Sequence, residues 1–171
     1  MNLTYIIILR LFHIYTGVFW AGATFYLARF VLPASNAIPE GGKFMQQLAK
    51  TNKLPIVMMV MSILNIVSGI LLIYEFSNGF DTSWFSTNFG MTLSIGGTFA
   101  IIAFVLGFTI TRPVIMKMAT LGKEIAAAGG APTPDQISLM ITFRNKVSKA
   151  TNLIALLLIV TVVTMAIGRY L

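Results

Sequence analysis

Four long apolar segments constrain this chain more than any other feature of its sequence. They cover residues 3–32, 54–74, 90–111 and 150–168. A transmembrane α-helix needs about 20 mostly apolar residues, and each segment is close to that length. A helix in lipid satisfies its own backbone hydrogen bonds, so such segments assemble as bundles. We expect an all-α membrane protein, a four-transmembrane-helix bundle, with a single integral membrane domain over residues 1–171.

The composition supports this prediction and excludes several functional classes. Of 171 residues, 57% are hydrophobic and 10% are charged, whereas a soluble domain carries about a quarter charged residues. The absence of cysteine excludes disulfides, thiolate metal sites and iron–sulfur clusters. The single histidine excludes any site that needs two histidines from one chain. No Ser–His–Asp arrangement and no glycine-rich phosphate motif is visible.

The basic residues predict how the bundle is oriented. Lys43, Lys50 and Lys53 lie between the first two segments, six further Lys and Arg lie between the last two, and the middle connection has none. The positive-inside rule places the first and third connections in the cytoplasm and both termini outside. The net charge of +7 therefore indicates topology, and no nucleic-acid partner is expected. We expect a multi-pass protein of the bacterial cytoplasmic (inner) membrane, surrounded by lipids. The N-terminus lacks the basic residues of a cleavable signal, so the first helix is expected to remain.

Prolines and glycines predict the structure of the connections. The first connection is expected to break at Pro33 and again over residues 38–42, before a short interfacial helix containing Phe44 and Leu48. The third helix is expected to continue, kinked, past Pro113 to about residue 128. The sequence from Thr133 to residue 136 is a capping box that starts the last helix. These features predict a cytoplasmic helical hairpin between the third and fourth spans.

Ionisable groups inside a span are costly, so each is a candidate for a functional site. The first segment contains such groups. His13 is the only imidazole, and Arg10, Gly17 and Trp20 share its face at helical spacing. An imidazole above a glycine leaves a gap in which a flat ring such as a porphyrin fits. A proximal histidine is a standard haem-iron ligand. We therefore predict His13 as the metal ligand of a haem b and Arg10 as partner of a propionate. Gly17 would give the ring clearance, and Trp20 would pack beside it.

The same depth on the other helices is predicted to hold small or polar residues. Asn65 on the second segment and Thr98 on the third are level with His13 and are candidate cofactor contacts. Such a layer suits a packed polar interface as well as a cofactor slot. In the interface alternative, His13 bonds a neighbouring helix, Gly17 permits close packing and Arg10 pairs with Glu75.

Residues 12–29 carry a family resemblance. The stretch contains Phe12-His13, then Trp20-Ala21-Gly22, and then Phe25-Tyr26-Leu27 followed by Arg29. It resembles the first helix of HemJ-type protoporphyrinogen oxidases and of the related CopD-like membrane proteins, including their uncharacterised bacterial members. The resemblance implies a helical membrane protein with haem b on the first-helix histidine, and in the HemJ-like case oxidation of protoporphyrinogen IX. Those oxidases carry a further His and a Lys in a later helix, and residues 91–98 hold neither.

Three functional hypotheses follow. The first is a haem-b membrane protein with a redox or tetrapyrrole-related role. The second is a non-enzymatic accessory subunit of a larger, for example respiratory, membrane complex. The third is CopD-like copper handling. Whether the protein is an enzyme stays open, and a homo-oligomer would supply a second His13 across an interface.

Overall fold

The structure, a computed structural model, describes residues 2–38 and 41–171. Within these ranges the elements are helical and no strand occurs. Expectations that concern Met1, Pro39 and Glu40 lie outside the described residues. In chain order the elements are α1 (Leu3–Tyr26), the π-turn η1 (Leu27–Val31), α2 (Leu32–Ala37), α3 (Gly41–Lys50), α4 (Leu54–Phe76), α5 (Thr82–Phe85), α6 (Asn88–Leu106), the π-turn η2 (Gly107–Thr111), α7 (Arg112–Ala127), α8 (Pro134–Ile167) and the 3₁₀ turn η3 (Gly168–Tyr170).

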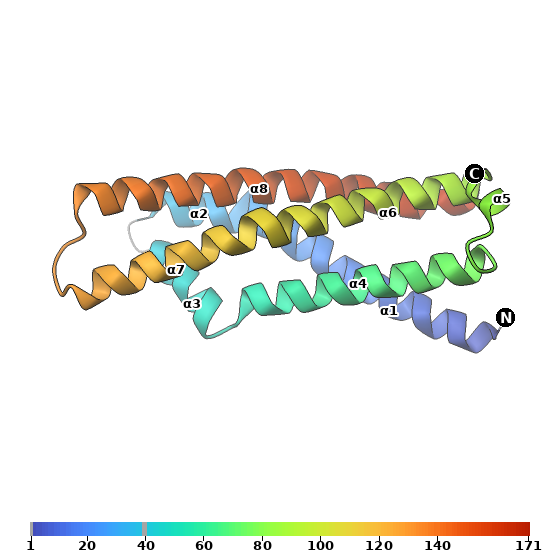
Figure 1. The fold of residues 1–171 in the computed structure, drawn as a ribbon, viewed down its shortest axis with the longest axis horizontal. Coiled ribbons are helices and arrows are strands. Elements are labelled where there is room, and N and C mark those ends of the chain that lie inside the picture. The colour runs from blue at the N-terminus through green and yellow to red at the C-terminus, as the bar shows by residue number, and fades with distance from the viewer. Residues whose placement is uncertain (1, 39–40) are drawn as a thin grey trace.

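Four continuous helices are long and apolar enough to cross a membrane, as the sequence predicts. They comprise Leu3–Ala37, Leu54–Phe76, Asn88–Ala127 and Pro134–Tyr170. Figure 1 shows them running along the longest axis of the molecule, with both termini at the same end. We call this end the terminal end, and the opposite end, where α7 connects to α8, the hairpin end.

The bundle consists of two helix pairs. α1 packs mainly on α4 and α6 mainly on α8, while contacts between the two pairs are sparser. A buried cluster joins the pairs through Trp20 of α1, Ala103 of α6 and Leu158 of α8. The two pairs are therefore fastened to each other by apolar packing around the Trp20 side chain.

The two long helices with a proline in their interior, at Pro33 and Pro113, stay helical, and the predicted break at Pro33 is wrong. Proline lacks an N–H, and its ring crowds the preceding helical turn. In each helix the turn before the proline widens into a π-turn, in which Leu32 N–H bonds to the carbonyl of Leu27 and Arg112 N–H to that of Gly107. The first helix therefore continues to Ala37. The predicted continuation of the third helix past its proline is confirmed.

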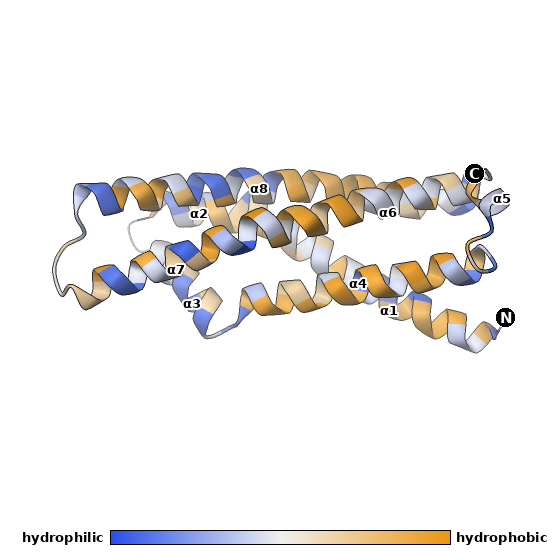
Figure 2. Cartoon of the chain, viewed as in Figure 1, coloured by the Kyte–Doolittle hydropathy of each residue, from blue (hydrophilic) through white to orange (hydrophobic). Residues whose placement is uncertain are grey.

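The hairpin end has its own small core. α3 forms where a short helix is predicted, and its Met45 packs against the cluster of Leu32, Val114 and Val147, while Phe44 stays exposed. The predicted capping box at the start of α8 is confirmed, because Thr133 Oγ1 accepts from the Gln136 N–H and the Gln136 side chain accepts from the Thr133 N–H. Figure 2 shows polar residues concentrated on α3, α7 and the first part of α8, and apolar residues prevailing toward the terminal end.

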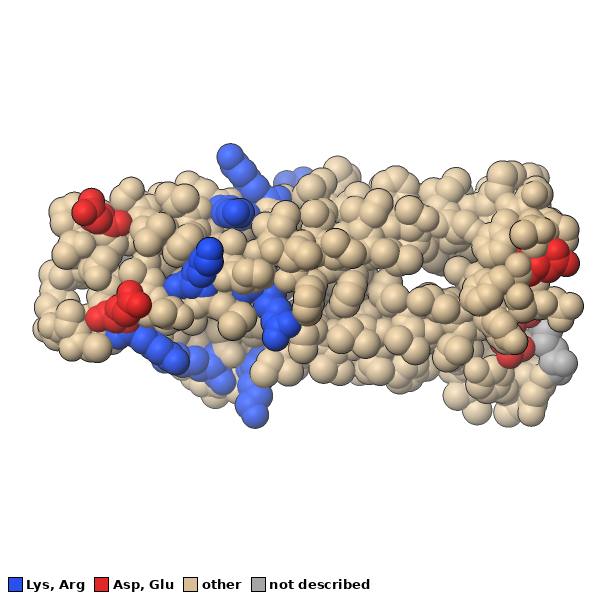
Figure 3. All heavy atoms as spheres, in the orientation of Figure 1, with Lys and Arg blue, Asp and Glu red and all other residues tan. Residues whose placement is uncertain are grey.

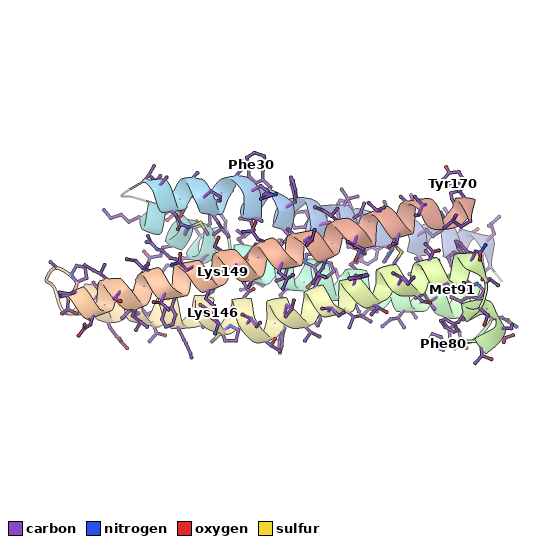
Figure 4. The ribbon with its side chains drawn as sticks, turned by 90° about the horizontal axis from the view of Figure 1, so that it is seen from above. Phe30, Phe80, Met91, Lys146, Lys149 and Tyr170 are labelled. Atoms are coloured by element: carbon purple, nitrogen blue, oxygen red, sulfur yellow. The ribbon has the colours of Figure 1, made fainter. Side chains whose placement is uncertain are left out.

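Charge is segregated along the long axis. Figure 3 shows Lys and Arg gathered in a band between the hairpin tip and a long uncharged stretch, with Asp and Glu at the two extremes of the visible face. In Figure 4, Lys146 and Lys149 lie far along α8 from Met91, Phe80 and Tyr170, which lie at the terminal end. The uncharged stretch between these groups is the part of the bundle that suits a lipid environment.

The α6–α8 contact is expected to depend on Gly96. A side chain at this position would collide with Thr164 Oγ1 and approach Met165, and Thr161 donates to the Gly96 carbonyl at 3.1 Å. Gly96→Leu should therefore destabilise the protein by about 1–3 kcal/mol through overpacking, measured as a lower thermal midpoint in detergent. Gly22→Leu is the matched control, since no atom lies within 4 Å of its added Cβ. Equal midpoints for the two variants would contradict this packing.

Candidate functional site

A cavity of about 560 Å³ lies between the two helix pairs in the terminal half of the bundle. Its volume falls in the range of small-molecule and cofactor sites. Figure 3 shows the molecule hollowed between the upper and lower helices toward this end. α1, α4, α6 and α8 all contribute to the wall, as does η3. The apolar part of the wall comprises Ile14, Ile66, Gly69, Ile70, Leu72, Ile73, Phe76, Phe89, Leu93, Gly97, Ala100, Ile101, Met165, Gly168 and Leu171.

The polar side chains in the wall are few and unbalanced in charge. They are Arg10, His13, Asn65, Thr161 and Arg169, with no Asp or Glu side chain among the described lining residues. An apolar cavity with a few convergent polar groups is the usual form of a ligand site. Here the arginines are exposed, and the Asn65 amide and the Thr161 hydroxyl bond to backbone carbonyls of neighbouring helices.

Hydrogen bonds fix the imidazole of His13 in one orientation and one tautomer. Its Nδ1 lies 3.0 Å from the backbone carbonyl oxygen of Asn65 and 3.1 Å from Oγ of Ser68. The carbonyl only accepts, and the Ser68 hydroxyl already donates to the Leu64 carbonyl at 2.7 Å. Asn65 Nδ2 also lies 3.3 Å from Nδ1, but its two hydrogens serve the closer His13 carbonyl and Thr16 Oγ1, so the contact with the Asn65 carbonyl assigns the proton to Nδ1. This leaves Nε2 with a free lone pair, and Nε2 makes no hydrogen bond within the described part of the chain.

A carbonyl acceptor on one ring nitrogen is the arrangement by which proteins orient a metal-binding histidine through the other nitrogen. His13 belongs to the cavity wall. The ring rests against α4 at Gly69, where an added Cβ would lie 2.9 Å from His13 Cε1. Glycine at position 69 therefore gives the imidazole its place against α4.

The amide of Asn65 completes the contact between α1 and α4. Its Nδ2 donates to the His13 carbonyl at 2.8 Å and lies 3.4 Å from Thr16 Oγ1. An added Cβ at Gly17 would lie 2.8 Å from the same Nδ2. Gly17 thus makes room for the Asn65 amide, which is buried. Sequence analysis placed Asn65 level with His13, and the structure brings the two residues into direct contact.

Arg10 and Arg169 enter the cavity wall from different helix pairs. Arg10 belongs to α1, and Arg169 belongs to η3 at the end of α8. The Arg169 guanidinium lies 5.5 Å from the ring centroid of Tyr170. Within the described ranges no carboxylate lies within the 4.0 Å of an ion pair with either guanidinium. The alternative pairing of Arg10 with Glu75 is therefore not formed.

Three predicted contacts lie outside the cavity wall. Trp20 is buried in the central core, in one cluster with the wall residue Ala100. Gly17 lies under the Asn65 amide, as described above. Thr98 is exposed, and its hydroxyl donates to the Ser94 carbonyl of its own helix at 2.8 Å. The wall position next to Thr98 is Gly97, whose lack of a side chain widens the cavity.

Sequence reasoning missed Ser68 and Gly69, which contact the imidazole from α4 together with the Asn65 carbonyl. Their signal is the spacing of small and polar residues along α4, because Ser62, Asn65 and Ser68 are all buried at three-residue intervals. Such a stripe marks a helix–helix interface in a membrane bundle. It therefore identifies the face of α4 that meets His13.

The potential metal ligands are sparse. No group of three or more His, Cys, Asp or Glu able to hold a metal ion occurs among residues 2–38 and 41–171. The wall contains one imidazole, that of His13, and one thioether, that of Met165. These two types serve as axial ligands of haem iron, which needs only one or two protein ligands.

No known protein-family description, no curated protein and no solved structure matches this chain. The arrangement of the site residues therefore carries the functional argument.

The Asn65 contact is expected to stabilise the α1–α4 pair. Asn65→Ala removes the bond to the His13 carbonyl and leaves a void over Gly17. The loss should be about 1–2 kcal/mol, read as a lower thermal midpoint. Asn152→Ala is the matched control, since Asn152 is exposed and donates only to Ser148 of its own helix. If both variants melt together, Asn65 does not hold the pair.

Proposed function

We propose that this protein is a haem-b-binding integral membrane protein with a redox or tetrapyrrole-related role. The observation that carries the proposal is the orientation of His13. Its Nδ1 is committed to the Asn65 carbonyl and Ser68, its Nε2 is free, and the residue lines an apolar cavity of about 560 Å³. This is the chemistry of a proximal histidine.

The residues in the cavity fit the group they are proposed to hold. Haem is a flat apolar macrocycle with two acidic propionates, and the cavity is an apolar space between two helix pairs with guanidiniums in its wall. His13 would bind the iron through Nε2, and Arg10 would pair with a propionate. When bound, haem b supplies a centre that gains and loses one electron.

The remaining residues of the site support the imidazole and the cavity wall in this proposal. Asn65 and Ser68 hold the imidazole and set its tautomer. Gly17 admits the Asn65 amide, and Trp20 closes the inner end of the wall by packing with Ala100. Thr98 is exposed and makes no contact with the ligand in this proposal, since its hydroxyl bonds to the Ser94 carbonyl of its own helix.

The resemblance of the first helix to HemJ-type and CopD-like proteins supports the same ligand. It does so through His13 and the aromatic and glycine residues that follow. The wall contributions of α6 include neither a histidine nor a lysine. We therefore propose haem binding, and no step of protoporphyrinogen oxidation is assigned to residues of this chain. CopD-like copper handling has less support, since one imidazole and one thioether line the cavity.

We also propose an orientation in the bacterial cytoplasmic membrane. The band of Lys and Arg visible in Figure 3 would lie at the cytoplasmic surface, because cytoplasmic connections are rich in these residues. The terminal end and the candidate site would then lie toward the outer surface. The α7–α8 hairpin would project into the cytoplasm.

The second candidate function is that of an accessory subunit in a larger membrane complex. It is favoured by the first part of α8, where Ile137, Leu139 and Ile141 are all more than 40% exposed. A shallow groove between Pro134 and Thr142 lies on this helix. Apolar side chains on a projecting hairpin are a typical docking surface for a partner protein. Isolation with a defined set of membrane subunits would support this role.

Haem binding is tested by absorption spectroscopy of the detergent-purified protein supplied with excess haemin. We expect a Soret band, and α and β bands after dithionite reduction. His13→Ala should lower haem affinity at least tenfold because the iron loses its protein ligand, and added imidazole should restore part of the spectrum. Tyr15→Ala is the control, since Tyr15 is exposed on the same helix and lies outside the wall. A colourless wild type, or full haem content in His13→Ala, refutes the proposal.

A further inference from the structure

We propose that Arg10 and Arg169 together form the recognition site for two acid groups on one ligand, one arginine from each helix pair. This assigns Arg169 as a specificity-determining residue. It rests on the proposed haem-binding function and specifies its ligand class, an apolar macrocycle that carries two carboxylates at one edge.

The first reason is position. Arg10 precedes His13 by three residues, which is roughly 4.5 Å of helical rise toward the terminal end. Arg169 follows Met165 and Gly168, and all three line the same cavity. Both arginines therefore line the part of the cavity nearest the terminal end, where their side chains are exposed, and His13 lies deeper. A ligand whose iron was held by His13 would have its acid edge toward the arginines.

The second reason is charge. Arginine stays protonated, so the two side chains bring two positive charges to a wall whose described residues include no Asp or Glu side chain. The carboxyl group of Leu171 in the same wall accepts a hydrogen bond from Asn88 and forms no ion pair with either arginine. Neither forms an ion pair with a described carboxylate. A guanidinium beside apolar surface is stabilised by an oxyanion, which it binds through two parallel hydrogen bonds. A ligand with one acid would leave one arginine without a partner, whereas two acids satisfy both.

The third reason is topology. Contacts between the two helix pairs are sparse, and the cavity separates the pairs at this end. One ligand that engages Arg10 of one pair and Arg169 of the other would join them. A phospholipid phosphate is the competing source of an oxyanion, because arginines near the ends of spans reach toward headgroups. The two sources are distinguished by removing the charge from the ligand.

The experiment compares haemin with haemin dimethyl ester, in which both carboxylates are neutral. Their dissociation constants are measured by Soret titration for the wild type, Arg10→Gln, Arg169→Gln and the double variant. We expect the wild type to bind haemin at least tenfold more tightly than the ester. Each single substitution should reduce this ratio, and the double variant should bring it near one. The ester affinity should stay constant throughout, which also reports that each variant is folded.

Arg112→Gln is the matched control. Arg112 lies 5.2 Å from the ring of Phe108, much as Arg169 lies beside Tyr170, and it is outside the cavity wall. This variant should keep the wild-type ratio. Because each compound's partition into detergent is the same for all variants, changes in the ratio report the arginines alone.

Two results would overturn the inference, and they are distinguishable. Equal affinity of the wild type for haemin and the ester, with a Soret band that still depends on His13, overturns the acid-recognition role and leaves haem binding intact. The arginines would then serve lipid phosphates. No binding of either compound that depends on His13 overturns the proposed function and, with it, this inference.

Discussion

A backbone N–H or carbonyl without a partner costs several kcal/mol inside a lipid bilayer, and most of this fold follows from avoiding that cost. The chain stays helical even at Pro33 and Pro113, where a π-turn redirects the hydrogen bonds of the preceding turn. Many hydroxyls also bond to their own helix, as those of Thr24 and Thr98 do. Few polar groups are then left to connect one helix with another.

In the middle of the bundle these connections lie beside glycines. The Asn65 amide reaches the His13 carbonyl over Gly17, and the imidazole of His13 lies against Gly69. Thr161 donates to the carbonyl of Gly96 itself. In a membrane bundle, helices are drawn together by packing and by such bonds, and a side chain at these positions would hold the helices apart. The candidate site is thus part of the packing of α1 on α4.

The cavity exists because each helix pair is well packed internally while the pairs meet mainly around Trp20. Toward the terminal end no described side chain fills the space between them. The space is open along part of its boundary, and its apolar wall, with an oriented imidazole and two arginines that form no ion pair, suits a bound molecule. A ligand there would have both a chemical role and a structural one, since it would join the two pairs.

The sequence by itself determined the four apolar helices, the capping box at Thr133 and the closeness of His13 to Asn65. Each depends on local composition, on helical period or on depth counted along a helix, which a single chain reveals. Only the tertiary structure decided that α1 turns Gly17 toward Asn65 and Trp20 into the core, and that Thr98 is exposed while Gly97 lines the cavity. Residues at the same depth in the bundle can point in any direction around their helices. The rotation of each helix about its own axis is set by packing against neighbouring helices. The continuation of the first helix through Pro33 was likewise decided by tertiary packing. A proline predicts a break, but the apolar contacts of α2 and its π-turn keep the helix intact.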